Sequence, residues 1–350
     1  MKKYSIAVTE GDGIGPEIIK EAIKVLTAVG KKFSLAFEFV DAPAGGNAYK
    51  KLGSALPPDT LQRYRDCDAV LKAPVGLPDI PPGLVERDMV LAARQELDLY
   101  VNLRPVKLFD CLREVSPLKD WIVGKGIDLV IVRENSEGAY CRRGSIGADG
   151  AMDESVYTEK GVDRIIKYAF EYAKKFDRRK VTSVDKANVL QTSKYWRSRF
   201  DEIRRLYPQF ETESIYVDAM SQFLIKNPYD YDVLVTDNLF GDILSDEAAE
   251  ITGSLGLCGG ANTNPESGAG IFEPIHGSAP KHAGTGIANP TSMILAVKMM
   301  LEHLGERQGA DAIYSAVEKT LAGGIRTKDI APEKLVSTSQ FGDEVAKRVC

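Results

Sequence analysis

Short apolar runs alternate with amphipathic helical patterns along most of the chain, and this alternation constrains the fold more than any other feature. The strand-like runs cover residues 5–8, 69–72, 128–132, 180–184 and 231–236, and the helical patterns cover residues 16–29, 161–175, 241–252 and 290–304. Such alternation is typical of proteins in which helices cover a largely parallel sheet. We therefore predict an α/β fold.

Three segments between these elements lack apolar periodicity. Residues 77–83 and 258–270 are rich in glycine, proline and asparagine, and we predict that both are loops. Residues 141–153, with the sequence CRRGSIGADGAMD, predict a loop or hairpin that projects from the core.

The composition excludes several classes of function. The chain has 350 residues, of which 44% are hydrophobic, so it can bury a large core, and its length suggests two domains. Its net charge of -5 and the lack of a basic block argue against a nucleic-acid partner. No apolar run approaches the roughly 20 residues of a membrane span, and the N-terminus MKKYSIAV lacks the pattern of a signal peptide. We therefore expect no membrane partner and a cytoplasmic location.

Cysteine and histidine chemistry has little support in the sequence. The five cysteines show no CxxC spacing, which indicates free thiols rather than disulfides or a zinc site. None of the three histidines lies in an HExxH motif. We therefore look to other side chains for the chemistry.

The stretch TEGDGIGPE is a glycine-rich turn between an expected strand and an expected helix. Gly11 and Gly13 match the first two glycines of a dinucleotide-binding Rossmann turn, but Pro16 stands at the third place, where that motif needs no side chain. Proline suits the first turn of a helix instead. The Rossmann interpretation therefore fails, and the glycines around Asp12 need another explanation.

Two carboxylates lie four residues apart in the segment FGDILSDEA. On a helix, Asp242 and Asp246 share one face and can share a cation. Their oxygen atoms suit a hard ion such as Mg²⁺ or Mn²⁺. The alternative is an exposed acidic helix face with no ligand.

Three arginines and one lysine are candidates for binding and catalysis. Arg94, Arg104 and Arg133 could bind a dicarboxylate or tricarboxylate through bidentate contacts, although surface ion pairs are the alternative. Lys186 follows an expected strand, where a partly desolvated ammonium group can act as a base. The alternative for Lys186 is a solvated surface lysine.

A set of motifs resembles the isocitrate/isopropylmalate family of β-decarboxylating dehydrogenases, in order and over nearly the whole chain. The motifs are GDGIGPE, RQELDLYVNLRP, VRENSEGAY, VDKANV, YVDAM, NLFGDILSD and FEPIHGSAP followed by GIANP. The resemblance implies a large two-domain α/β fold that is not a Rossmann fold. It also implies a homodimer that shares its active sites. The implied domains are a discontinuous cofactor-binding domain of residues 1–100 and 256–350, and a dimer-forming domain of residues 101–255 with an arm near 141–158.

The resemblance also assigns roles to individual residues. Tyr140 and Lys186 match the catalytic pair, and Arg94, Arg104 and Arg133 match the carboxylate-binding arginines. The metal-binding carboxylates correspond to Asp218, Asp242 and Asp246, with Lys186 and Asp218 reaching the site of the partner subunit. The implied cofactor-binding residues are Ile14, Asn188, Glu273, His276, Gly277, Ser278, Ala279, Lys281, His282 and Asn289.

The implied reaction is the oxidative decarboxylation of a malate-type 2-hydroxy acid with Mg²⁺ or Mn²⁺. Val90 and Leu91 resemble the apolar pair that meets the isopropyl group in isopropylmalate enzymes, and Asp88 disfavours the third carboxylate of isocitrate. Arg87 departs from the glutamate that isopropylmalate enzymes typically carry. We therefore expect conversion of 3-isopropylmalate to 4-methyl-2-oxopentanoate and CO₂.

Several alternatives remain within the family. The segments ESVYTEKGVDRIIKYAFE and NTNPE also resemble the tartrate/D-malate branch, so these substrates are the first alternative. Homoisocitrate and isocitrate are the next alternative substrates. A different class, the non-catalytic regulatory subunit, is disfavoured because Tyr140, Lys186 and the three aspartates are present.

The expected cofactor is NAD(P), with a modest preference for NADP. After HGSAP, NAD-linked members typically carry Asp-Ile, whereas this chain has Lys281 and His282, which resemble the Lys-Tyr of NADP-linked isocitrate enzymes. The GIANP segment instead resembles the NAD-linked form. The alternative for Lys281 is a solvated loop lysine that merely fails to exclude NADP.

Overall fold

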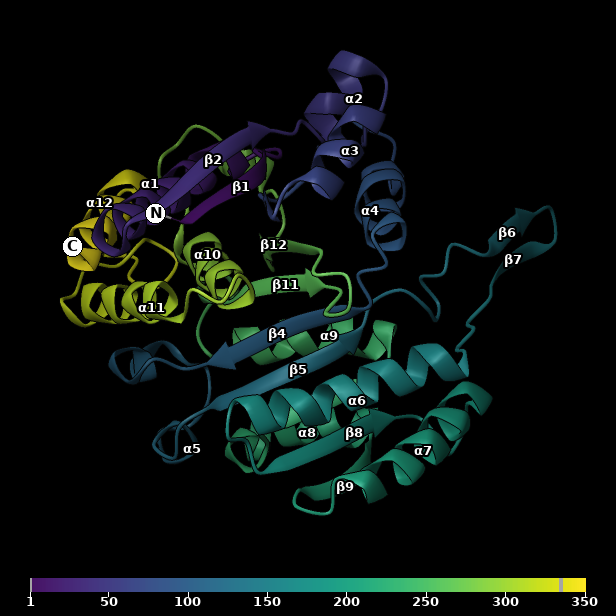
Figure 1. Ribbon diagram of the computed structural model, residues 1–350. Coiled ribbons are helices and arrows are strands. Elements are labelled where there is room, and N and C mark those ends of the chain that lie inside the picture. Colours follow the sequence, from purple (N-terminus) through teal and green to yellow (C-terminus); the bar gives the residue numbers. More distant parts are fainter. Residues whose placement is uncertain (1, 334–335) are drawn as a thin grey trace.

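The computed structural model describes residues 2–333 and 336–350, which form one mixed sheet covered by helices on both faces (Figure 1). The sheet has ten strands in the order β2-β1-β3-β12-β11-β4-β5-β10-β8-β9. This architecture confirms the predicted α/β fold.

The sheet consists of two halves that draw on different parts of the chain. The first half contains β1 (Lys2–Thr9), β2 (Leu35–Asp41), β3 (Ala69–Lys72), β11 (Gly259–Thr263) and β12 (Gly270–Pro274). The second half contains β4 (Val101–Lys107), β5 (Asp128–Glu134), β8 (Lys180–Asp185), β9 (Glu211–Tyr216) and β10 (Val233–Thr236). The halves meet where β11 pairs antiparallel with β4, with Ala261 opposite Leu103 and Thr263 opposite Val101. The division into two domains stays a prediction.

Helices bury an apolar stripe against each half of the sheet. The helices are α1 (Gly15–Phe33), α2 (Gly46–Leu52), α3 (Pro58–Asp66), α4 (Ala92–Glu96), α5 (Asp120–Val123), α6 (Glu159–Lys175), α7 (Gln191–Ile203), α8 (Val217–Lys226), α9 (Asn238–Glu250), α10 (Thr291–His303), α11 (Arg307–Ala322) and α12 (Thr338–Val349). Helix α1 shows the principle, because Ile18, Ala22, Val25 and Val29 recur at helical spacing and are all buried. None of these helices is long and apolar enough to cross a membrane.

The segment 258–270 corrects one expectation, because strand β11 occupies residues that the composition assigns to a loop. Strand β11 consists of small residues, Gly-Gly-Ala-Asn-Thr, and is buried throughout. A Cβ atom on Gly259 would lie 2.7 Å from the backbone nitrogen of Ala296, so a larger residue would push α10 away. Close packing of α10 therefore explains the glycine that propensity associates with loops.

The segment 141–153 forms a two-stranded hairpin that projects from the molecule, as expected (Figure 1). Strands β6 (Gly144–Gly147) and β7 (Gly150–Asp153) pair antiparallel, with Ile146 opposite Ala151. The side chain of Ile146 is 91% exposed. An apolar residue presented in this way has nothing to pack against in the described part of its own chain.

Candidate active site

Three buried arginines from different elements lie close enough to perturb one another. Arg94 lies on α4, Arg104 on β4 and Arg133 on β5. Burial, together with the charges of Arg133 and Arg104, lowers the pKa of Arg94 to about 10. Burial and Arg133 likewise lower the pKa of Arg104. The site is therefore strongly electropositive and suited to a ligand with more than one carboxylate.

A buried carboxylate holds two of these arginines in place. Glu273 forms an ion pair with Lys72, and its Oε1 lies 3.5 Å from Nη2 of Arg94. Asn262 donates a 2.7 Å hydrogen bond to Glu273 and accepts one from Asn102. Arg104 in turn donates to Asn102 over 2.7 Å. Glu273, predicted as a cofactor ligand, thus contacts Arg94 and is linked through Asn262 and Asn102 to Arg104.

Arg133 joins the other two arginines to Tyr140 and Asp242. Its guanidinium donates to Asn238 over 3.0 and 2.7 Å and forms an ion pair with Asp242. The hydroxyl of Tyr140 donates to the other oxygen of Asp242 over 2.9 Å. Burial and the charge of Asp242 raise the pKa of Tyr140, so Tyr140 is protonated at neutral pH and can deliver a proton.

Asp242 and Asp246 lie one turn apart on α9, as the spacing predicts. Burial alone would raise the pKa of Asp242, but Arg133 and the hydrogen bond from Tyr140 lower it. Burial raises the pKa of Asp246, which has no ion-pair partner among residues 2–333 and 336–350. These oxygen donors fit a hard divalent cation. Within the described residues, no cluster of three metal-ligating side chains forms in the single chain.

Lys186, Asn188 and Asp218 lie apart from this cluster. Lys186 forms an ion pair with Asp218, whose side chain is 61% exposed, and Asn188 is also exposed. The ion pair lowers the pKa of Asp218. The single chain therefore brings Tyr140, Asp242 and Asp246 together, and places the other predicted catalytic and metal-binding residues on an open surface.

Val90 and Leu91 lie in a π-helical segment, Glu86–Leu91, directly before α4. Val90 packs against a small apolar cluster, whereas Leu91 belongs to none of the described apolar clusters. A π-turn accommodates one residue more than an α-turn. Arg87 is exposed and pairs with Asp88 over 2.7 Å, while Glu86 lines a cavity between residues 75–86 and the HGSAP loop.

The position of Glu86 bears on the departure from the family pattern at Arg87. The sequence places Arg87 where isopropylmalate enzymes typically carry glutamate, but the structure turns Glu86 toward Gly277 and Ser278. An acidic side chain therefore still faces this loop.

The turn at residues 11–14 packs tightly against two other loops. Gly11 and Gly13 have φ values of 71° and 58°, and a Cβ atom on Gly13 would lie 2.0 Å from the carbonyl oxygen of Ser278. The backbone nitrogen of Ile14 donates to that same oxygen over 2.9 Å. The glycines therefore allow the turn to touch the HGSAP loop.

Asp12 has a structural role that the sequence left open. Its buried carboxylate accepts hydrogen bonds of 2.7, 2.8 and 2.7 Å from the backbone nitrogens of Gly46, Asn47 and Gly76. One side chain thus joins three loops around the expected cofactor site.

A cavity of about 670 Å³ lies beside this turn. Its lining includes six predicted cofactor residues, namely Ile14, His276, Gly277, Ala279, His282 and Asn289. Burial lowers the pKa of His276, whose Nε2 is buried without a partner among the described residues. A ligand with a hydrogen-bonding group could satisfy this nitrogen.

The same cavity includes residues that sequence reasoning missed. Lys328 and Asp329 line it, together with Ser254, Gly256, Ile287 and Ala288. Asn289 and Ser254 donate to the carboxylate of Asp329 over 2.9 and 2.8 Å. Lys281 is exposed and is not part of the lining, so Lys328 is the lysine that borders this cavity. No apolar pattern marks Lys328 in the sequence.

Comparison with known proteins identifies relatives of the whole chain. Residues 5–345 match the family described as isocitrate/isopropylmalate dehydrogenase. The chain is 46% identical to 3-isopropylmalate dehydrogenase of Thermotoga maritima, over 98% of both chains, and 44% identical to that of Haemophilus influenzae, over 100% of both. The crystal structure of isocitrate dehydrogenase from Methylococcus capsulatus is also similar, with 40% identity, a TM-score of 0.91, and coverage of 100% of this chain and 99% of that one.

The network around Glu273 predicts a pH-dependent contribution to stability. Burial alone would raise the pKa of Glu273, but Lys72, Arg94 and Arg104 lower it to about 2. Because the folded-state pKa lies below the ordinary value of about 4.3, the ionised group stabilises the fold above that pH and loses this effect as pH falls toward 2. Glu273→Gln should therefore lower the free energy of unfolding by about 2–3 kcal/mol at pH 7 and by less at pH 3.

Urea unfolding at pH 7, 5 and 3 measures this difference. Glu10→Gln is the matched control, because Glu10 is exposed and makes no side-chain contact in the described structure. Its stability should equal that of the unchanged protein at each pH. A Glu273→Gln difference that stayed constant from pH 7 to pH 3 would contradict the argument.

Proposed function

Starting from the premise that the chain belongs to the isocitrate/isopropylmalate dehydrogenase family of decarboxylating dehydrogenases, we propose that its substrate is 3-isopropylmalate. The products are 4-methyl-2-oxopentanoate and CO₂, with transfer of a hydride to NAD(P). The observation that carries this proposal is the buried cluster of Arg94, Arg104 and Arg133 beside Leu91. The arginines suit two carboxylates, and Leu91 offers an apolar contact to a branched alkyl group.

The residues of the site have separate tasks in this reaction. The arginines orient the carboxylates so that one of them lies β to the carbon that becomes a ketone. Lys186 of the second subunit removes the hydroxyl proton. After CO₂ departs, Tyr140 protonates the resulting enolate. The pKa of Tyr140, raised by burial and by Asp242, keeps this proton in place until it is needed.

A divalent cation, Mg²⁺ or Mn²⁺, belongs to the same proposal. Asp242 and Asp246 would hold it, together with Asp218 of the second subunit. When bound, the ion stabilises negative charge on the substrate oxygen. The position of Asp246 supports this role, because its carboxylate has no ion-pair partner among residues 2–333 and 336–350 and lies one helical turn from Asp242.

A substrate comparison tests the proposed function. We expect kcat/KM for 3-isopropylmalate to exceed that for D-malate, tartrate, homoisocitrate and isocitrate by at least about tenfold, equal to roughly 1.4 kcal/mol of transition-state binding. Excess EDTA should abolish the activity. Isocitrate is the competing substrate suggested by the similar Methylococcus capsulatus structure, and D-malate or tartrate by the sequence. Preference for any of these would overturn the assignment.

We also propose that two subunits share each active site. Exposed apolar side chains follow Lys186 in the chain or lie on α8, which carries Asp218, and on α9, which packs against α8. They are Val189, Leu190, Ile225, Leu239 and Ile243, of which Ile243 is 60% exposed. Contiguous apolar surface of this kind marks a protein interface. Leu239 and Ile243 share α9 with the carboxylates of Asp242 and Asp246, so a second subunit on this surface would border the site.

Mixed dimers test the shared site. Lys186→Ala and Tyr140→Phe subunits should each be inactive, and their mixture should regain roughly a quarter of the activity, because half of the dimers are hybrids with one intact site. The matched control mixes Lys186→Ala with Asp218→Asn. Both residues serve the partner's site, so this mixture should remain inactive. Equal recovery in the two mixtures, or none in either after proven exchange, would refute sharing.

The proposed cofactor preference is modest and favours NADP. Lys281 is exposed near the cavity, and Lys328 lines it, so two ammonium groups can attract a 2′-phosphate. One partly exposed charge contributes on the order of 1 kcal/mol, which gives a several-fold preference. His282, rather than the typical isoleucine, also borders the cavity.

A charge reversal tests the cofactor preference. Lys281→Asp should shift the ratio of kcat/KM for NADP to that for NAD toward NAD by about fivefold or more. Lys174→Asp, an exposed lysine on α6, serves as the control and should leave the ratio unchanged. A preference of the unchanged enzyme for NAD by more than about tenfold would contradict the charge argument.

A further inference from the structure

A second groove lies on the face of the sheet opposite the candidate active site. Strand β4 separates the two, because successive side chains of a strand point to opposite faces. Arg104 belongs to the active site, whereas its neighbours Leu103 and Pro105 line the groove. Figure 1 shows α10 and α6 in front of the sheet and α9, which carries Asp242, behind it. The groove is therefore separate from the catalytic residues.

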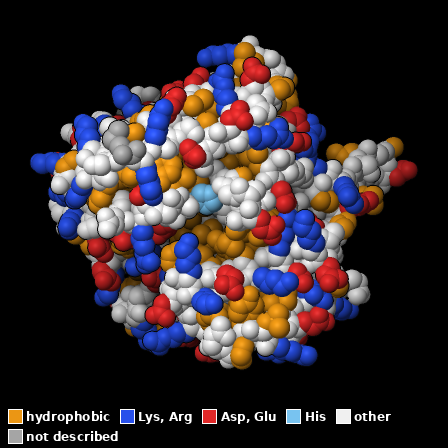
Figure 2. All heavy atoms as spheres, in the orientation of Figure 1, with side chains coloured by type: hydrophobic (Ala, Val, Ile, Leu, Met, Phe, Trp, Pro, Cys, Tyr) orange, Lys and Arg blue, Asp and Glu red, His pale blue; other side chains and the backbone are white. Residues whose placement is uncertain are grey.

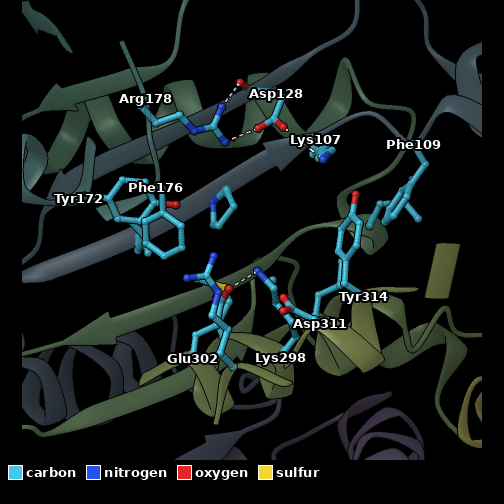
Figure 3. Close-up of a pocket in the computed structure, with 17 residues that line it drawn as sticks. Lys107, Phe109, Asp128, Tyr172, Phe176, Arg178, Lys298, Glu302, Asp311 and Tyr314 are labelled. Atoms are coloured by element: carbon cyan, nitrogen blue, oxygen red, sulfur yellow. Dashed lines mark hydrogen bonds and ion pairs between the residues drawn. The ribbon is translucent and has the colours of Figure 1, made fainter. Parts of the chain in front are cut away.

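The groove has an apolar floor and aromatic walls. A cavity of about 300 Å³ lies between α10 and α11 of the first half and α6 of the second (Figure 3). Leu103, Pro105 and Met299 contribute apolar surface to the lining. Figure 3 shows Phe176 and Tyr314 on opposite sides of the cavity. An adjoining cavity of about 440 Å³ shares part of this lining. Figure 2 shows the hydrophobic side chains in a hollow on this face.

Most charges around the groove already have partners. Asp128 pairs with Arg178 and, over 3.3 Å, with Lys107. Lys298 pairs with Glu302 over 2.8 Å. The opposite charges in these ion pairs neutralise one another, so these residues attract a charged ligand only weakly.

Two oppositely charged residues on α11 have no such partner in the described part of the chain. Arg307 and Asp311 both line the cavity and lie one helical turn apart. Neither makes a salt bridge or a side-chain hydrogen bond within the described part of the chain, although both charges lie at the mouth of an apolar chamber. Both residues are exposed, so a guanidinium group and a carboxylate one helical turn apart are accessible to a ligand.

We propose that this groove binds a free amino acid with a large apolar side chain. Its α-carboxylate pairs with Arg307 and its ammonium group with Asp311, while the side chain lies on Leu103, Pro105 and Met299. A zwitterion supplies both charges that the helix leaves unpaired, whereas a simple carboxylate or amine supplies one. The aromatic walls at Phe176 and Tyr314 suit a side chain of the size of leucine or phenylalanine.

Binding in this groove should affect the opposite face. The ligand contacts α11 in the first half of the sheet and Phe176 in the second, across the pairing of β11 with β4. If the two halves move relative to one another as the predicted domains, a ligand that draws these walls together moves them apart on the active-site face. By linkage, it should weaken substrate binding there.

Calorimetric titration tests the binding site, and this measurement is independent of the proposed function. The probes are L-leucine and L-phenylalanine, with glycine, 4-methylpentanoate and 3-methylbutylamine as comparisons. The titrations are run with saturating NADP to occupy the cofactor cavity. We expect millimolar binding of at least one of the two amino acids and at least about fivefold weaker binding of all three comparison compounds.

Three variants locate the bound amino acid. Arg307→Gln and Asp311→Asn should each weaken its binding by about fivefold or more. Arg205→Gln is the matched control, because Arg205 is exposed, does not line the groove and has no salt bridge in the described structure. No binding of either amino acid, or equal binding by 4-methylpentanoate, would overturn the proposal. Unchanged affinity in Arg307→Gln and Asp311→Asn would also overturn it.

Steady-state kinetics provides a second readout, which does rest on the proposed function. The bound amino acid should raise KM for 3-isopropylmalate with little change in kcat, and Arg307→Gln should reduce this effect. If KM rises equally in Arg307→Gln, the amino acid acts at the active site and the proposal is wrong. Failure of the proposed substrate would remove this readout but would leave the calorimetric result intact.

Discussion

Mutual repulsion among buried guanidinium groups is the physical constraint on which the candidate site depends. Burial lowers the pKa values of Arg94 and Arg104, and the charge of Arg133 lowers both further, so the three guanidinium groups repel one another. Glu273 and Asp242 offset part of this repulsion from opposite sides. A ligand with two carboxylates, such as the proposed substrate, would offset the rest of this repulsion.

The central sheet separates the candidate active site from the groove on its opposite face. Strand β4 directs Arg104 to one face and Leu103 to the other, so the two faces can be occupied independently while sharing one backbone. On the cofactor side, the carboxylate of Asp12 ties its own turn to two other segments through the backbone nitrogens of Gly46, Asn47 and Gly76. Side chains near the expected cofactor can therefore vary without loss of the loop arrangement.

Local patterns predict much of the fold and part of the site. Strands, helices and the spacing of Asp242 and Asp246 depend on periodicity within a few residues, which a single sequence displays. Strand β11 was missed because its small residues lack the branched side chains that indicate a strand, and its neighbours supply the pairing. The pairing of Lys72 with Glu273 joins distant segments, and no local pattern specifies such a partner. The residues of the second subunit remain predictions for the same reason.

The interleaved order of the sheet has a consequence for folding during synthesis. Strand β3 lies between β1 and β12, so the first half of the sheet cannot close before residues 270–274 have left the ribosome. Helix α12 then packs on α1, with Lys32 donating to the carbonyl oxygen of Val349 over 2.6 Å. The strands of the second half, which lie within residues 101–236, can pair earlier. The apolar faces of β1 and α1 therefore stay exposed until β12 and α12 have been synthesised. We expect the growing chain to be most prone to aggregation, and most dependent on chaperones, during this interval.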